Sequence, residues 1–313
     1  MISLYHLHIE PTSRCNARCP QCPRTDITTG DTQSWLNQTE WDPSRLDEVL
    51  SHSVFDPLKS ILVNGNYGDI VMHSRPLEFV EVCRKHAKEV NLNTNGSGLK
   101  TDFWSELGKM GVSVDFSIEG MSQETHEQYR RNTIFNRILE NAKAFIDAGG
   151  IANWVMTVFR HNQHEVDDCE EFARYLGFND FSTRDGGMRF DAPNLVFRHK
   201  GEQHMIEPPT NYAVQANDNP QMAVDLSLQN KCYIRVKHLM ISLFLSADER
   251  IYPCCYADNI QDDISLKIDL DVLEKQVKQI YDEYVATQFT SSPQQVCQKI
   301  CSVKGISNVS FTQ

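Results

Sequence analysis

The first 185 residues alternate short apolar, β-branched runs with longer amphipathic stretches, a pattern typical of repeated strand and helix units. The predicted strands are Leu4–Glu10, Ser60–Asn64, Val90–Thr94, Val112–Ile118, Ala152–Phe159 and Asp180–Arg184. The predicted helices are Pro43–Ser51, Pro76–Glu89, Thr101–Met110 with a threonine cap, Phe135–Ala148 and Glu165–Leu176. Strand then helix, repeated, predicts right-handed crossovers and a parallel sheet, either open or closed into a barrel.

The pattern changes after this region. Residues 186–229 are punctuated by Gly, Pro and Asn without a sustained period, which indicates a linker over the barrel. Beyond it, Tyr233–Leu245 and Glu249–Cys254 are typical of two strands joined by a turn, and Leu270–Ala286 is typical of a helix.

These patterns predict three parts. A barrel covers residues 1–185, the linker covers 186–229, and a small α+β domain covers 230–313. A chain of 313 residues is long enough for one large domain and a smaller one.

Composition narrows the possible functions. A hydrophobic fraction of 40% is ordinary for a soluble protein, and no apolar run approaches the roughly 20 residues that span a bilayer. The first ten residues lack the basic flank and cleavage site of a signal peptide, so we expect a cytoplasmic protein without a membrane partner. A net charge of -12 argues against general nucleic-acid binding, which depends on Lys and Arg.

Most of the ten cysteines fall into two groups. Disulfide scaffolds are typically small secreted domains, so metal or cluster ligation is the better interpretation of a large chain with grouped cysteines. Cys83 and Cys169 lie in predicted helices away from both groups, and we interpret them as core or surface thiols.

The first group is Cys15, Cys19 and Cys22, in the loop that follows the first predicted strand. In α/β barrels the catalytic residues lie at the C-terminal ends of the strands. Three soft thiolates with one ligand missing suit an iron–sulfur cluster whose fourth iron stays open. The alternative is a structural zinc site that takes its fourth ligand from elsewhere.

The spacing and position of this loop resemble the radical S-adenosylmethionine (SAM) superfamily, whose hallmark is Cys-x3-Cys-x2-Cys after the first strand of a partial (β/α)6 TIM-like barrel. The resemblance implies that Cys15, Cys19 and Cys22 hold a catalytic 4Fe-4S cluster, and that the amino and carboxylate groups of SAM chelate its unique iron. Gln21 departs from the aromatic residue that the family commonly has there.

The segment after the second strand resembles a variant of the family motif that binds the SAM amino group, through Gly65, Asn66, Gly68 and Asp69. Glycines allow close backbone approach, and a carboxylate suits an ammonium group. The same residues would also suit a tight turn.

Polar residues also end the third and fourth strands, at Asn93, Asn95, Ser117 and Glu119. Such side chains on a rigid scaffold suit a ribose. They resemble the Thr-Asn-Gly and Ser-Ile-Asp-Gly elements of SPASM/Twitch radical SAM enzymes, with Glu119 replacing the usual aspartate.

Three further residues complete the expected cofactor site. Arg130 matches a family arginine that reaches the SAM carboxylate, although Arg131 is an alternative and both would suit an exposed helix turn. Val155 and Met156 on the fifth strand would line the adenine pocket, or would simply belong to the barrel core.

The second group is Cys232, Cys254, Cys297 and Cys301, with Cys255 as a spare or alternative ligand. Its order resembles the Twitch form of the SPASM domain, which implies one auxiliary 4Fe-4S cluster with four cysteine ligands. Zinc held by the same cysteines is the alternative, because thiolate spacing does not choose between the two.

The resemblance implies a radical SAM enzyme, of oxidoreductase or transferase (maturase) type, that makes a 5'-deoxyadenosyl radical and abstracts a substrate hydrogen atom. It also implies an external electron donor of flavodoxin or ferredoxin type. We expect a peptide or protein side chain as substrate. A small molecule (a sugar, aminocyclitol or nucleotide) is the alternative, and a structural zinc-binding interaction protein is the alternative of another class.

Arg184 and Asp185 end the sixth strand at the expected mouth of the substrate site. An arginine there would clamp a carboxylate or phosphate. An ordinary ion pair between these two residues is the alternative.

Overall fold

The computed structural model describes residues 4–186, 194–210, 241–255 and 265–282. Three cysteines of the second group, Cys232, Cys297 and Cys301, lie outside these residues, as does Gly187. For Asp185 only the backbone is described.

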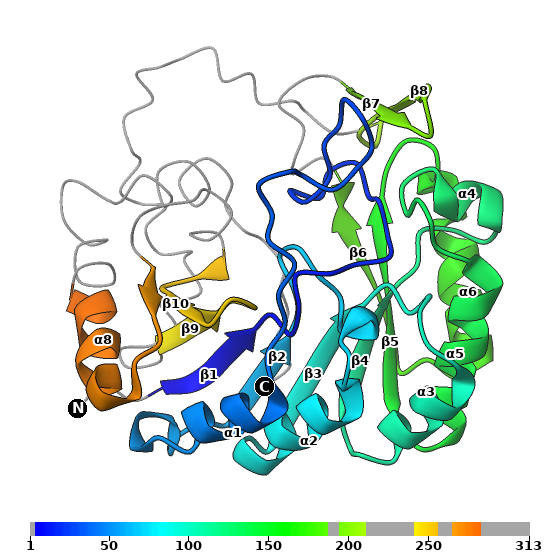
Figure 1. Cartoon of the computed structure of the whole chain (residues 1–313). Helices are drawn as coiled ribbons and strands as arrows, with labels where there is room; N and C mark the ends of the chain where they lie inside the picture. The colour runs from blue at the N-terminus through cyan, green and yellow to red at the C-terminus, as the bar shows by residue number, and fades with distance from the viewer. Residues whose placement is uncertain (1–3, 187–193, 211–240, 256–264, 283–313) are drawn as a thin grey trace, which may run out of the picture.

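The six strands predicted for the barrel are confirmed, each within one or two residues. They are β1 (Leu4–Ile9), β2 (Ser60–Val63), β3 (Glu89–Thr94), β4 (Ser113–Ser117), β5 (Ile151–Val158) and β6 (Asp180–Asp185). Each pairs in parallel with the next in sequence, so that all six carboxyl ends point to one rim, at the top of Figure 1. Polar residues that end different strands are thereby brought together.

The five predicted helices are also confirmed. They are α1 (Pro43–Leu50), α2 (Pro76–His86), α3 (Thr101–Gly108), α5 (Phe135–Asp147) and α6 (Val166–Leu176). The short α4 (Gln123–Glu127) was not predicted, and short 3-10 turns lie at Ser53–Phe55 (η1), Ile70–Met72 (η2) and Gln163–Glu165 (η3).

Local chemistry sets most helix ends. The Asp42 side chain accepts the N–H groups of Ser44 and Arg45 to cap α1, and Gly177, with a φ of 90°, ends α6 in the left-handed conformation. The expected cap of α3 is wrong: Thr101 is its first helical residue, and Lys100 before it makes no side-chain cap.

The main core lies between the sheet and its helices, which cover the outer face of the curved sheet in Figure 1. Alternate strand residues such as Leu92, Phe116 and Trp154 pack there and are fully buried. The residues between them are mostly polar and face the inner side, as Asn91, Asn93 and Asp115 illustrate. TIM barrels usually fill this side with branched apolar residues, so the inner face is unusually hydrophilic.

Three more strands extend the sheet beyond β1: β9 (Ile241–Leu245), β10 (Arg250–Tyr252) and β11 (Leu266–Lys267). β9 pairs in parallel with β1, whereas β10 is antiparallel to β9, as the predicted two-strand turn requires. After η7 (Leu270–Val272), α8 (Leu273–Ile280) packs its apolar residues into the main core. The C-terminal strands therefore continue the barrel sheet.

The segment predicted to be an irregular linker contains an antiparallel hairpin, β7 (Leu195–His199) and β8 (Glu202–Ile206). Its turn residues Lys200 and Gly201 both have positive φ, as a two-residue turn of type I′ requires. The hairpin stands above the rim in Figure 1. No helix among the described residues is long and apolar enough to cross a membrane.

Candidate active site

The loop after β1 carries the first three cysteines over the rim of the sheet (Figure 1). Their side chains gather in one apolar cluster with Tyr129, Phe159 and residues of the β7–β8 hairpin. Cys19 is buried, and the other two are half-buried. The thiols are therefore brought together and shielded from water by side chains from distant parts of the sequence.

Their electrostatics suit a bound cation. Burial raises the pKa of the Cys15 thiol, and Asp69 and the neighbouring thiols raise it further. Burial likewise raises the pKa of Cys19 to about 11, against the opposing charge of Arg130. Three thiolates at this place need positive charge, which iron would supply.

The three thiols suit an iron–sulfur cluster better than a single metal ion. Among the described residues, no three His, Cys, Asp or Glu side chains converge on a single metal-ion position. A 4Fe-4S cluster binds each thiolate through a different iron, so its ligands surround a volume and not a point. Three thiols within one apolar cluster of side chains fit such a group.

Arg24 fixes the shape of the cysteine loop. Its guanidinium is buried and donates to the backbone carbonyls of Cys15, at 2.9 Å, and Ala17, at 3.2 Å. These bonds hold the first turn of the loop in place.

Asp69 organises the neighbouring strand end. Its carboxylate accepts hydrogen bonds of 2.7 Å from the Thr94 hydroxyl and from both the backbone and side-chain N–H groups of Asn95. Asn95 also donates to Asn16 at 2.9 Å and lies 3.7 Å from Cys15 Sγ. The structure thus brings Asp69, Asn95 and the cysteine loop together, with Asp69 engaged by the protein itself.

The loop that contains Asp69 lies very close to the cysteine loop. A Cβ on Gly68 would lie 1.6 Å from the carbonyl oxygen of Thr12, so this position requires glycine. The Asn66 carbonyl lies 3.8 Å from Cys22 Sγ, and its side chain donates a 2.7 Å hydrogen bond to the Cys255 carbonyl.

Glu119 and Arg130 form the buried ion pair of the site. Arg130 Nε donates to Glu119 Oε2 at 2.9 Å, and Arg130 Nη1 lies 3.7 Å from Cys19 Sγ. Burial lowers the pKa of Arg130, but the charge of Glu119 outweighs it and holds that pKa well above its ordinary value. Of the two candidate arginines, Arg130 faces the cysteines, whereas Arg131 lies over the Phe197 ring.

Two buried acceptors at the site are unused. Glu119 Oε1 and Asn93 Oδ1 have no hydrogen-bond partner within the described part of the chain. Orphaned buried acceptors are costly unless a ligand donates to them. Ribose hydroxyls and an ammonium group are donors of this kind, so these atoms fit SAM.

The remaining predicted residues lie at or near this rim. Val155 and Met156 are both buried on β5, but Met156 packs into the core beneath the helices, and Val155 is outside that core. Ser117 is half-buried at the end of β4. A Cβ on Gly65 would lie 2.3 Å from the carbonyl oxygen of Gly68, so a larger residue would not fit there.

Arg184 points across the inner face of the sheet. Its Nη2 lies 4.0 Å from Asp115 Oδ2 on β4, two strands away, and the Arg184 side chain is 53% exposed. Asp115 in turn accepts a 2.9 Å hydrogen bond from Asn153. Asp115, which sequence reasoning missed, is thus a partner of Arg184.

The C-terminal cysteines are only partly described. Cys254 and Cys255 are half-buried after β10 and pack against Phe244 and Tyr252.

Sequence reasoning also missed Glu10, His161 and the hairpin residue Phe197. Glu10 is fully buried. A glutamate directly after a buried strand was a usable signal, because a buried carboxylate needs hydrogen-bond donors around it. Burial lowers the pKa of His161 to about 4, and its Nε2 has no partner in the described chain. Phe197 belongs to the same apolar cluster as Cys19.

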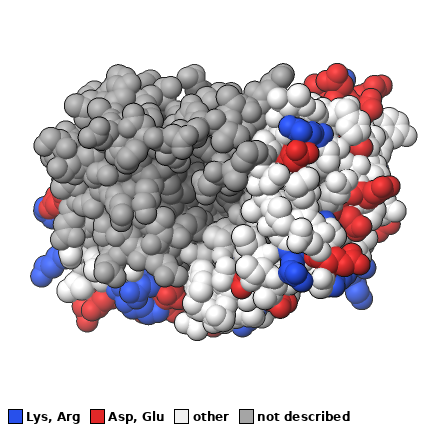
Figure 2. Space-filling model, turned by 90° about the horizontal axis from the view of Figure 1, so that it is seen from above, with Lys and Arg blue, Asp and Glu red and all other residues white. Residues whose placement is uncertain are grey.

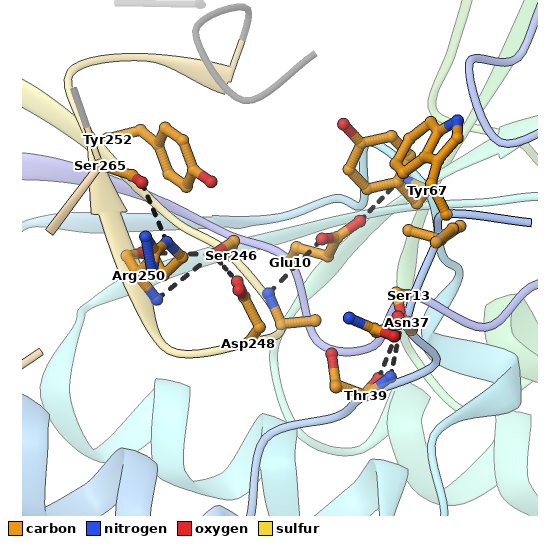
Figure 3. A pocket seen from close by; sticks show the side chains of 13 residues that line it. Glu10, Ser13, Asn37, Thr39, Tyr67, Ser246, Asp248, Arg250, Tyr252 and Ser265 are labelled. Carbon is orange, nitrogen blue, oxygen red and sulfur yellow. Dashed lines mark hydrogen bonds between the residues drawn. The ribbon is translucent and has the colours of Figure 1, made fainter. Parts of the chain in front are cut away.

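Glu10 also lines a cavity of about 320 Å³ between the segment 35–39, Tyr67 and the β9–β10 turn (Figure 3). Seen from above the rim, the described surface is largely uncharged, and its acidic and basic side chains are interspersed mainly toward the edge (Figure 2).

Comparison with known proteins gives one family match. The pattern of the radical SAM superfamily matches residues 9–176, more than half of the chain. The matched residues include the cysteine loop and strands β2 to β5.

Two curated relatives share part of the sequence. The subtilosin biosynthesis protein AlbA of Bacillus subtilis is 25% identical over 186 residues, which cover 56% of this chain and 38% of AlbA. A probable GTP 3',8-cyclase of Methanothermobacter marburgensis is 26% identical over 178 residues, 56% of this chain and 55% of the relative. The chain thus spans about half or less of the length of these relatives.

Among solved structures, SuiB of Streptococcus suis is similar, with a TM-score of 0.62 and 14% identity over 96% of this chain and 72% of SuiB. At this identity the likeness concerns the fold. It confirms the predicted class, a partial TIM-like barrel of α/β type.

Proposed function

The chain belongs to the radical SAM superfamily, and from that premise we propose that it is an enzyme that modifies a peptide or protein side chain, with Cys15, Cys19 and Cys22 as the ligands of its catalytic cluster. Members of the superfamily use a 4Fe-4S cluster and SAM, which are accordingly the cofactors of this chain. When bound and reduced, they supply a 5'-deoxyadenosyl radical that abstracts a hydrogen atom.

The convergence of the three thiols with the orphaned acceptors carries this proposal. Glu119 Oε1 and Asn93 Oδ1 would accept from the ribose hydroxyls or the SAM ammonium group. Arg130 uses its Nε–H group to bind Glu119, and other N–H groups of its guanidinium would bind the SAM carboxylate. Asn95, Ser117 and Val155 would complete the SAM pocket.

The chain's own residues would protect such a radical from water. Phe197 and Ile206 of the hairpin pack over the cysteine loop together with Tyr129 and Phe159. An apolar cover excludes water from the reacting atoms and so limits side reactions.

The substrate class is supported by the relatives. AlbA is a biosynthesis protein of the bacteriocin subtilosin, and SuiB has been crystallised bound to its precursor peptide SuiA. The hydrophilic inner face, with Arg184 and Asp115, would receive a polar segment of such a peptide. The GTP 3',8-cyclase relative favours a second candidate, a nucleotide substrate, for which Arg184 would bind phosphate.

We further propose one auxiliary 4Fe-4S cluster held by Cys232, Cys254, Cys297 and Cys301, with Cys255 as the alternative to Cys254. The half-buried Cys254 and Cys255 beside two aromatic rings support a ligand at this place. A flavodoxin- or ferredoxin-type protein would supply the electrons.

The test is anaerobic incubation with SAM, dithionite and either short peptides encoded beside the gene or GTP. The proposal predicts a mass change in a peptide that depends on Cys19. Consumption of GTP with every peptide unchanged would contradict the peptide assignment and favour the nucleotide.

A further inference from the structure

Glu10 is a fully buried carboxylate that the proposed reaction does not use directly. It follows β1 directly and precedes Cys15 by five residues. Burying a carboxylate is costly unless donors surround it, so its contacts indicate what it does.

Three backbone N–H groups from two distant segments donate to this side chain. Oε1 accepts from Tyr67 at 2.7 Å and from Gly68 at 3.2 Å, and Oε2 accepts from Ala247 at 3.4 Å. In Figure 3 the side chain lies between Tyr67 on one side and the turn of Ser246 and Asp248 on the other. Glu10 therefore ties the loop after β2 to the turn between β9 and β10.

The loop after β2 continues directly into the cofactor site. Asp69 donates its N–H to the Arg14 carbonyl at 2.9 Å, and its carboxylate holds Asn95, which reaches Asn16 and Cys15. The tight contact of Gly68 with Thr12 leaves this loop little room to shift. A displacement at Glu10 would thus reach the residues proposed to bind SAM.

The other connection leads to the second cysteine group. Ala247 begins the turn into β10, which ends shortly before Cys254. The Asn66 side chain makes a second link between the same two segments through the Cys255 carbonyl. Glu10 and Asn66 together hold the C-terminal strands against the SAM loop.

We propose that Glu10 is a positioning residue that sets the SAM-binding loop against the cysteine loop and locks it to the C-terminal strands. The inference rests on the proposed function, because it assumes that the loop at 65–69 binds SAM. It concerns SAM affinity and not cluster ligation, since Glu10 accepts from backbone N–H groups of the loop after β2 and of the turn between β9 and β10.

The test measures the Kd for SAM of anaerobically reconstituted protein by equilibrium dialysis, with iron content and Tm measured alongside. Glu10→Gln keeps the size of the side chain but removes its charge. It also places an amide NH2 group against the backbone N–H groups that one carboxylate oxygen now accepts. Glu10→Asp keeps the charge with a shorter reach. Glu140→Gln, an exposed carboxylate on α5, is the control for the loss of one charge.

We expect Glu10→Gln to raise the Kd about tenfold, and Glu10→Asp to raise it less, while iron content matches the control and Tm falls only modestly, because buried N–H groups lose an acceptor. An unchanged Kd, or a Kd that rises only together with loss of iron, would overturn the proposal. Wild-type protein that binds no SAM would instead contradict the proposed function.

Discussion

Arg130 Nε donates a 2.9 Å hydrogen bond to Glu119 Oε2 in a pair whose carboxylate is fully buried. The pair joins the end of β4 to the segment after α4, and the same guanidinium lies beside Cys19 Sγ. One residue thus both neutralises a buried charge and faces the proposed cluster. Its replacement should affect stability and SAM binding together.

Arg130→Ala should lower the free energy of unfolding by about 3–5 kcal/mol, because Glu119 would remain buried without its partner. Adding Glu119→Gln should restore part of this loss, since the uncompensated charge disappears. Urea unfolding measures both. Arg131→Ala, whose guanidinium stacks on Phe197, should leave the SAM Kd much less affected than Arg130→Ala; equal effects would show that the two arginines were assigned wrongly.

Iron analysis tests the number of clusters. Two 4Fe-4S clusters predict about eight iron and eight sulfide per chain, and the Cys15/Cys19/Cys22→Ala triple variant should keep about half. A colourless triple variant that contains stoichiometric zinc would identify the C-terminal site as a zinc site.

Arg184→Ala should spare uncoupled SAM cleavage and lower kcat/KM for the true substrate about tenfold or more, because only substrate positioning is lost. The ion pair with Asp115 is half-exposed, so its loss should cost little stability. Loss of SAM binding and of the cluster in this variant would place Arg184 in the cofactor site or the fold.

Acid should destabilise the protein through His126. Burial lowers its pKa to about 4, against 6.5 for an ordinary histidine, so the unfolded chain binds the proton more tightly. Stability is therefore complete above about pH 6.5 and is lost as pH falls toward 4, by about 2 kcal/mol between pH 7 and pH 5.

His126→Gln should show a smaller loss of unfolding free energy over the same range, although it is less stable at both pH values. The Glu119 N–H donates to His126 Nδ1, and Nε2 lies 2.9 Å from the Thr133 hydroxyl, so the neutral ring is the form that fits. Equal pH dependence in the two proteins would show that His126 does not titrate in this way.

The barrel could be predicted from sequence because its strands and helices differ in period and are separated by turn residues. The hairpin at 195–206 was missed among Gly, Pro and Asn, although Lys200-Gly201 between alternating apolar residues was a usable signal. The short α4 was missed as well, although Ser122 caps it through Thr125 N–H.

Pairings between distant segments could not be predicted. Periodicity predicted a strand at Tyr233–Leu245, of which the structure describes Ile241–Leu245, but it did not show that this strand lies beside β1. For the same reason the sequence indicated a polar Asp69 and Arg184, but not that Asp69 binds Asn95 or that Arg184 reaches Asp115. The role of Glu10 depends on contacts more than 50 residues away.

The central claim is that Cys15, Cys19 and Cys22 hold the cluster that cleaves SAM. Its most direct measurement is 5'-deoxyadenosine formed by anaerobic protein with SAM and dithionite, compared between wild type, Cys19→Ala and Cys83→Ala, which alters a buried core thiol on α2. Wild type and Cys83→Ala should form the product, and Cys19→Ala should form none above background. Equal product from all three proteins would contradict the account.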